Sequence, residues 1–232
     1  MTTDVNWHRD RVAGTSSLLL ILTWATLLIL LVEMGLNAFQ YQLISDAISG
    51  NFASAAELAE RATQNYNYRL IEGAVRVAVE VAAAITFLVW VYRSDALARA
   101  LGSDRMAHSP AWSVIWFFVP FANLVKPYYV LKEIYVGTVV PKTYNLRLDE
   151  PAGLHTLTLW WWATIAEGLF QAVASLLADG SEGLQLRSTN LLAGSGALSI
   201  VATILMLLVV MDFEREQQTA VPAVPDAAPS MA

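Results

Sequence analysis

Long runs without ionisable residues dominate the hydrophobic pattern of this chain of 232 residues. Leu18–Val32 (LLLILTWATLLILLV) and Leu191–Met211 (LLAGSGALSIVATILMLLVVM) contain no charged side chain, and Leu157–Ala178 contains only Glu167. Because about 20 apolar residues cross the hydrocarbon core of a bilayer as a helix, these runs predict membrane spans. We expect an all-α membrane protein with four transmembrane helices, at about 14–45, 71–92, 157–178 and 191–211.

The prolines divide the chain between helices and connections. None of the eight lies in the four apolar runs, five lie between residues 110 and 151, and three lie in the tail. Since proline breaks or kinks a helix, each run can continue uninterrupted. The first two helices are expected to form a hairpin, with a turn at Ser49–Asn51 and a new start at Ser54–Glu57, whose S-x-x-E spacing is that of a capping box. The predicted organisation is a cytoplasmic N-terminal segment at 1–13, one transmembrane domain at 14–212 and a disordered, Pro- and Ala-rich tail at 213–232.

A proline-broken segment at 111–136 lies between the second and third spans. Only fifteen residues precede Lys126, and Pro120 interrupts them. A run that short favours a re-entrant or interfacial helix over a full crossing. We expect a half-helix from Trp112 to Val119, a break at Pro120, and a second helix that restarts after Pro127, a residue suited to the first turn of a helix.

Basic residues support this topology and give it an orientation. If the segment at 111–136 does not cross, both termini are cytoplasmic; ten of the fourteen Lys and Arg residues are then inside, three are outside, and Arg76 is within a span. A fifth span would largely remove this contrast, whereas basic residues normally concentrate in short cytoplasmic loops. The expected location is therefore the inner (plasma) membrane, with both termini on the cytoplasmic side. Seven tryptophans then lie near the cytoplasmic interface, namely Trp7, Trp90, Trp112, Trp116 and Trp160–Trp162.

Composition agrees with a membrane protein and narrows the chemistry. The chain is 56% hydrophobic and 15% charged, against about 45–50% and 25% in soluble domains. Its net charge of −6 comes without a basic block, so we expect no nucleic-acid partner. The absence of cysteine excludes disulfides and thiolate metal sites, and no histidine follows His155 to serve as a base for a serine in the last span. We expect no catalytic residue, no metal and no cofactor.

The central part of the chain resembles a bacterial membrane family catalogued as domain of unknown function 4328. The resemblance is carried by FLVWVYRSDALARALG, by SPAWSVIWFFVPFANLVKPYYVLKEIY and by LWWWA, covers roughly residues 70–212, and departs from the family's pattern at Ser94–Asp95. The family has no assigned activity, so the resemblance implies a fold and a site but no reaction. The candidate binding residues that it implies are Trp116, Pro120, Asn123, Lys126, Pro127, Tyr128, Lys132 and Glu133. The alternative is structural: the prolines and Asn123 fold a buried loop, and the lysines reach toward lipid phosphates.

Ionisable residues inside the predicted spans form a second group of candidates. Glu72, Arg76 and Glu80 recur every four residues and share a helical face. Each ionisable residue in a span costs about 2.5–3.5 kcal/mol on insertion scales, and such residues usually face a bundle interior or a watery cavity. They could form ion pairs that fix helix register, or line a cavity that binds or moves a small solute or a proton. The full predicted network is Glu33, Glu72, Arg76, Glu80, Glu167 and Gln171.

Two functions of different classes follow from these two groups. The first is a non-enzymatic scaffold or regulatory protein, whose aromatic cytoplasmic surface docks lipid or a protein partner. The second is a protein that binds a small solute, an ion or a proton, or lets it permeate, through the polar interior joined to the Asn123 segment. Membrane lipids are expected partners in both, and a homo-oligomer is compatible with either.

Overall fold

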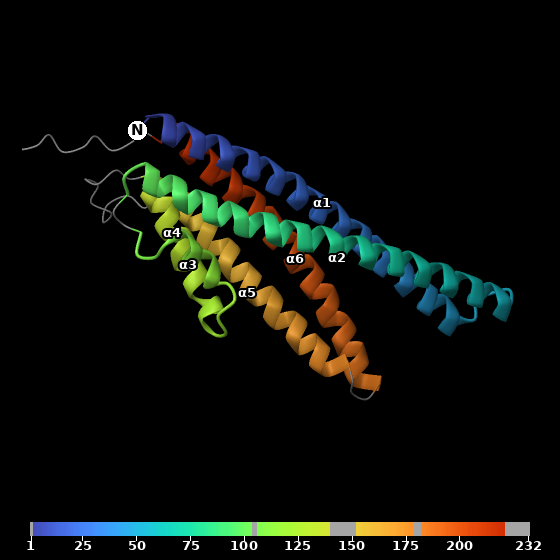
Figure 1. Ribbon diagram of the computed structural model, residues 1–232. Helices are drawn as coiled ribbons and strands as arrows, with labels where there is room; N and C mark the ends of the chain where they lie inside the picture. Colours follow the sequence, from blue (N-terminus) through green and yellow to red (C-terminus); the bar gives the residue numbers. More distant parts are fainter. Residues whose placement is uncertain (1, 104–105, 140–151, 179–181, 221–232) are drawn as a thin grey trace, which may run out of the picture. The chain divides into compact units, whose positions relative to one another are not determined.

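The computed structural model describes residues 2–103, 106–139, 152–178 and 182–220, and most of them are in helices (Figure 1). Within these ranges no strand is present. The helices are α1 (Thr2–Ser49), α2 (Ala55–Ala100), α3 (Pro110–Ile115), the 3₁₀ helix η1 (Ala122–Leu124), α4 (Lys126–Val139), α5 (Ala152–Ala178) and α6 (Glu182–Thr219).

The hairpin of α1 and α2 is held by the two local motifs that the sequence predicts. Gly50 adopts a φ of +68°, and the N–H of Asn51 donates to the carbonyl of Asp46 at 3.0 Å, which is the pattern of a helix that ends on a left-handed glycine. At the start of α2, Ser54 Oγ accepts from the N–H of Glu57 at 3.2 Å, and the Glu57 carboxylate accepts from the N–H of Ala53 at 3.1 Å. A turn and a reciprocal cap therefore connect two helices of 48 and 46 residues.

The chain divides into two compact units. Unit 1 contains Met1–Leu20, Ile85–Trp161 and Leu207–Ala232, and unit 2 contains Ile21–Ala84 and Trp162–Met206. The long helices α1, α2, α5 and α6 each contribute one portion to each unit, whereas α3, η1 and α4 belong to unit 1 alone.

The core of unit 1 is aromatic. Trp90 of α2 is fully buried, donates its indole N–H to Ser16 Oγ at 3.0 Å, and contacts Phe213 of α6 with ring centroids 5.1 Å apart. Phe213 also contacts Tyr135 of α4 at 4.9 Å. Beyond Phe213, the Arg9 guanidinium donates to the carbonyls of Gln217 and Ala220 near the end of α6, where a cation stabilises unpaired carbonyls.

These contacts revise the predicted tail. Residues 213–219 are helical, not part of a disordered segment, because α6 continues to Thr219 with Phe213 and Gln217 buried. The remainder of the predicted tail, 221–232, lies outside the described residues.

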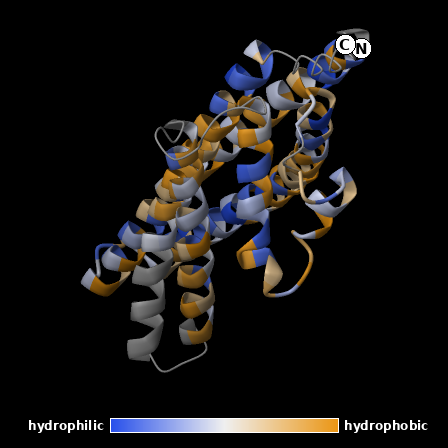
Figure 2. Ribbon diagram, turned by 90° about the vertical axis from the view of Figure 1, so that its left-hand side faces the viewer, coloured by the Kyte–Doolittle hydropathy of each residue, from blue (hydrophilic) through white to orange (hydrophobic). Residues whose placement is uncertain are grey.

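Within the described residues, three helices are long and apolar enough to cross a membrane: Asp4–Ser49, Ala55–Ala100 and Gly194–Thr219. Figure 2 shows hydrophobic residues in orange along the helical ribbons, interspersed with hydrophilic ones. Many apolar side chains of the three helices face outward; Leu28 and Val32 of α1 are 61% and 56% exposed. Exposed apolar surface of this extent is typical of contact with lipid. The fourth predicted span, α5, is not among the three.

The proline-broken segment is helical on both sides of its break, but the first helix is shorter than predicted. It ends at Ile115 instead of Val119, and the N–H groups of Phe117 and Phe118 make tighter i→i+3 bonds at 3.1 and 2.9 Å. Proline restricts the residue before it and has no N–H for the helical ladder, so Pro120 disturbs the preceding turn as well. The second helix begins at Lys126, with Pro127 in its first turn.

Candidate functional site

Polar side chains of unit 2 gather around Arg76 of α2. Its guanidinium bonds Glu33 of α1 at 2.6 Å and Glu80, one turn along α2, at 2.7 Å. The structure therefore brings together three of the residues predicted as a network. Arg76 and Glu33 are each about one-quarter exposed, whereas Glu80 is 45% exposed. Arg76 thus links α1 to α2 through a charge pair that is partly withdrawn from the surface.

Three more side-chain hydrogen bonds lie in unit 2: one joins α1 to α2, one joins α5 to α6, and one lies within α5. Arg69 of α2 donates to Asn37 Oδ1 of α1 at 2.6 Å. Glu167 of α5 accepts from Ser199 Oγ of α6 at 2.5 Å and from the Gln171 side chain at 3.1 Å. A hydrogen bond in which the donor or the acceptor is ionised is about twice as strong as a neutral one, so a bond between two helices of this kind favours one register of the pair.

These groups surround a polar cavity of about 290 Å³ in unit 2. Four helices contribute to it: α1, α2, α5 and α6. Two guanidinium groups, one carboxylate, two amides and three hydroxyls face a common space, so the cavity offers both donors and acceptors. We call it the polar cavity; it is lined by Glu33, Asn37, Arg69, Arg76, Gln171, Ser175, Ser195, Gly196 and Ser199.

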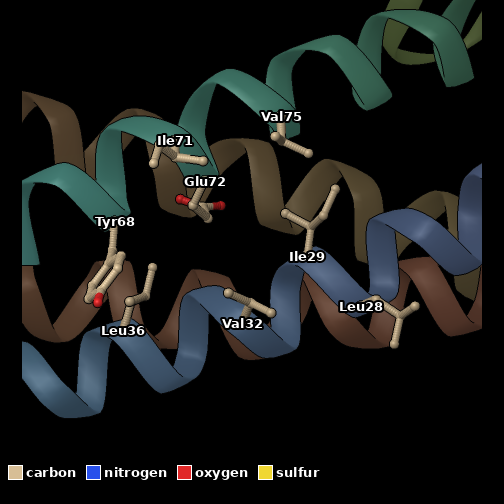
Figure 3. Close-up of a pocket in the computed structure, with 8 residues that line it drawn as sticks. All are labelled: Leu28, Ile29, Val32, Leu36, Tyr68, Ile71, Glu72 and Val75. Carbon is tan, nitrogen blue, oxygen red and sulfur yellow. The ribbon is translucent and has the colours of Figure 1, made fainter.

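Glu72 does not line the polar cavity but a separate groove between α1 and α2 (Figure 3). The groove has a volume of about 370 Å³, and its other lining residues are aliphatic except for Tyr68. Figure 3 shows the Glu72 carboxyl group between the two helices, with apolar side chains from both around it. We call it the Glu72 groove; its remaining residues are Leu28, Ile29, Val32, Leu36, Tyr68, Ile71 and Val75.

The proline-broken segment of unit 1 carries the second group of candidates, and only some of them meet. The Lys126 ammonium lies 5.2 Å from the centre of the Trp116 ring, within cation–π range. Trp116 also packs against Trp112 and His108, each with ring centroids 5.5 Å apart. Pro120 and Asn123 are exposed at the turn. Because it is exposed, Asn123 is not in the buried loop of the structural alternative, although its backbone N–H, which donates to the carbonyl of Val119 at 2.9 Å, does take part in the turn.

The tip of the segment is strained and apolar. The N–H of Ala122 bonds the carbonyl of Pro120 at 2.7 Å, which closes a three-residue turn centred on Phe121. Phe121 has a φ of +62°, a region that a bulky side chain rarely adopts, and this hand of γ-turn is the rarer one. The Phe121 side chain is nevertheless 86% exposed. Backbone strain at an exposed aromatic side chain favours a role in which that side chain contacts another molecule.

The base of the segment is anchored to neighbouring helices. The Tyr128 hydroxyl shares a hydrogen bond of 3.0 Å with Thr158 of α5, and the Trp161 indole donates to the carbonyl of Leu124 at 3.2 Å. Pro127 is buried, and Lys132 and Glu133 are partly exposed on α4, where the Glu133 carboxylate accepts from the N–H of Ala107.

Another anchor lies at Asp95 of α2. Its buried carboxylate bonds Arg99 at 2.6 Å and accepts from Ser113 Oγ of α3 at 2.5 Å. Asp95 therefore joins α2 to α3.

Sequence reasoning missed several residues of the polar cavity, namely Asn37, Arg69 and Ser175. Periodicity within one helix groups Glu72 with Arg76, but it cannot show which face of α1 or α5 meets that helix. Ser195 and Ser199 share a face at a spacing of four, and that spacing was the available signal. Among the described residues, no group of three or more His, Cys, Asp or Glu side chains is placed to hold a metal ion.

The model of the family described as domain of unknown function (DUF4328) matches residues 53–215, which include α2 to α5 and most of α6. No curated protein and no solved structure matches the chain.

Proposed function

The chain belongs to the family described as domain of unknown function 4328, and from that premise we propose that it is a multi-pass membrane protein whose polar cavity binds small polar or ionic solutes, protons included, and lets them pass. The observation that carries this proposal is the polar cavity itself. Ion pairs alone could fix helix register without leaving space between them, whereas about 290 Å³ remains open here. At ~30 Å³ for each water molecule in the liquid, that space holds roughly ten waters.

The proposed topology has four spans, with both termini cytoplasmic in the inner membrane. The fourth span is α5, whose 27 residues measure about 40 Å at 1.5 Å per residue, longer than the hydrocarbon core of ~30 Å. Its three consecutive tryptophans suit the boundary between lipid and water. The excess of basic residues in the loops assigned to the inside supports the orientation.

Proton flux into reconstituted vesicles tests the function. Vesicles that contain the full chain and a trapped pH-sensitive dye are given a pH gradient, and the rate of internal acidification is compared with that of protein-free vesicles. Glu167→Gln should lower the protein-dependent rate several-fold, because the carboxylate that accepts from Ser199 and Gln171 is removed. Glu214→Gln is a matched control, since Glu214 and Gln218 form the same i,i+4 pair at 3.1 Å on α6 outside the cavity.

A variant that fills the cavity tests the role of its open space independently of the Glu167 carboxylate. An added Cβ on Gly196 meets nothing within 4 Å, so Gly196→Leu should fold and occupy the cavity. We expect it to reduce flux while Glu167 stays intact. Equal fluxes with and without protein, for protons and for Na⁺, would remove the permeation proposal.

A second function is favoured by the proline-broken segment: a scaffold or regulatory protein that contacts anionic lipid through this segment. The supporting observation is its outward apolar surface, with Phe118 68% and Phe121 86% exposed, beside Lys126. A re-entrant or interfacial position would place these rings in lipid and the lysine among phosphates. The exposed apolar residues of the surface are Trp112, Ile115, Phe118, Phe121, Leu124, Val125 and Tyr129.

Lipid that co-purifies with the protein tests this second function. The double variant Lys126→Ala with Trp116→Ala should lose anionic lipid but keep zwitterionic lipid, as measured by mass spectrometry of the purified protein. Lys142→Ala, at a basic position outside the described residues, serves as the comparison. Unchanged anionic lipid in the double variant would count against the proposal.

A further inference from the structure

The Glu72 groove combines two features that rarely occur together, an apolar lining and a carboxyl group without a partner. One carboxylate oxygen of Glu72, Oε1, is buried and has no hydrogen-bond partner. Burial of an acceptor without a donor costs about 1–3 kcal/mol, and more when the acceptor is charged. The groove therefore contains a buried acceptor that lacks a hydrogen-bond donor, and aliphatic side chains surround it (Figure 3).

The arginines that flank Glu72 on α2 do not donate a hydrogen bond to its Oε1. Arg76 is bonded to Glu33 and Glu80. Arg69 donates to Asn37, and its Nε is a second buried atom of this cluster without a hydrogen-bond partner. The charges that act on Glu72 belong to these same residues: Glu33, Glu80, Arg69 and Arg76. With Glu72 ionised, this cluster contains three carboxylates and two guanidinium groups, so its net charge is −1. One additional positive charge would balance it.

We propose that the Glu72 groove binds a long-chain amphiphile with a protonated primary amine, whose ammonium pairs with the Glu72 carboxylate while its alkyl chain lies along the aliphatic lining. The volume of about 370 Å³ is within the range of roughly 300–1,000 Å³ found for small-molecule sites. An alkylammonium stays protonated at neutral pH, as the lysine side chain does. The site requires both parts of the ligand: the chain for the apolar walls and the ammonium for the carboxylate.

A neutral lipid chain is the main competing occupant, and it fits the walls but not Glu72. Such a chain would leave Oε1 buried without a donor. A quaternary ammonium would supply the charge but no N–H. These differences in chemistry make the proposal testable with ligands of equal chain length.

The experiment measures binding of radiolabelled dodecylamine to the full chain in nanodiscs of zwitterionic lipid, with protein-free nanodiscs subtracted to remove simple partitioning. Dodecanol and dodecyltrimethylammonium should each compete at least about tenfold more weakly than unlabelled dodecylamine, since a hydrogen bond to a charged group is lost. Equal competition by dodecanol would overturn the proposal and show that the groove binds any alkyl chain.

Two variants extend the test. Glu72→Gln should weaken dodecylamine binding at least about tenfold and leave dodecanol unchanged, whereas Glu60→Gln, at an exposed carboxylate on the same helix, should change neither. Val32→Trp should fill the groove and exclude both ligands. Dodecylamine binding that survives in Glu72→Gln or in Val32→Trp would contradict the proposal. If either variant fails to fold, the competition by dodecanol and dodecyltrimethylammonium in the wild-type chain tests the proposal without it.

Discussion

Replacing Arg76 with methionine would leave Glu33 and Glu80 of unit 2 without the cation that now bonds both. Methionine keeps an apolar stem of similar length, so the change removes mainly the charge and its hydrogen bonds. The same substitution at Arg61 provides a control, because Arg61 bonds Glu57 one turn earlier on α2 at 2.8 Å. Arg61–Glu57 and Arg76–Glu80 therefore share helix, spacing and residue types but differ in surroundings.

The geometry sets the expected size of the effect. Arg76 makes two charge-assisted hydrogen bonds, at 2.6 and 2.7 Å, and its side chain is 26% exposed. Hydrogen bonds to charged groups contribute about 1.5–3 kcal/mol each. Taking the lower end because of the partial exposure, Arg76→Met should reduce the free energy of unfolding by about 3 kcal/mol. The Arg61 side chain is 48% exposed, so Arg61→Met should cost only about 0.3–0.5 kcal/mol.

Unfolding by denaturing detergent in mixed micelles, followed by far-ultraviolet circular dichroism, gives both values on one scale. A double-mutant cycle with Glu33→Gln then isolates the pair between α1 and α2, and its coupling should exceed about 1 kcal/mol. If Arg76→Met and Arg61→Met cost the same, or the coupling is zero, Arg76 does not hold the helices around the polar cavity.

Three further predictions concern unit 1 and the topology. Gly153→Ala should cost about 1–3 kcal/mol in thermal unfolding, because the added Cβ would overlap the Tyr135 ring, whereas Gly73→Ala, with nothing within 4 Å, should gain up to about 1 kcal/mol. Burial, reinforced by the charge of Glu216, raises the pKa of Tyr135 from 10.0 to about 12. The neutral phenol should therefore contribute stability that is complete below pH 10 and is lost as the pH rises through about 12, with Tyr135→Phe as the reference in an ultraviolet titration. Cysteine introduced as Lys142→Cys should react with an impermeant maleimide only from the cytoplasmic side, and external labelling would reverse the proposed orientation.

Local signals in the sequence predicted those parts of the fold that depend on a few neighbouring residues. The turn at Gly50 and the Ser54–Glu57 cap are such features, since backbone conformation and one side-chain bond decide them. The end of α6 was missed because Phe213 and Gln217 stand among charged residues, and only contacts with other helices bury them. The end of α3 was placed too late because proline acts on the turn before it as well as on its own position.

The sequence predicted which candidate residues share a face of one helix, but it did not predict which residues of different helices face each other. Spacing of four placed Arg76 beside Glu80, and that pair is present. The same spacing suggested that Glu72 belongs to the network, but its carboxyl group lies in the Glu72 groove, apart from the polar cavity. Which residues of α1 and α5 face α2 depends on the rotation of each helix about its axis, and that rotation follows from packing of the whole bundle.

Thiol reactivity inside unit 2 tests the central claim most directly, because the chain contains no cysteine of its own. Ser199→Cys places a thiol in the polar cavity, and Ile204→Cys places one on an outward position of α6 that is 43% exposed and apolar. Only a hydrated thiol ionises and reacts with a charged, water-soluble reagent. We predict that the cysteine at 199 reacts in vesicles and the cysteine at 204 does not. An inert cysteine at 199, with a folded protein, would show that the cavity is dry and would contradict the account.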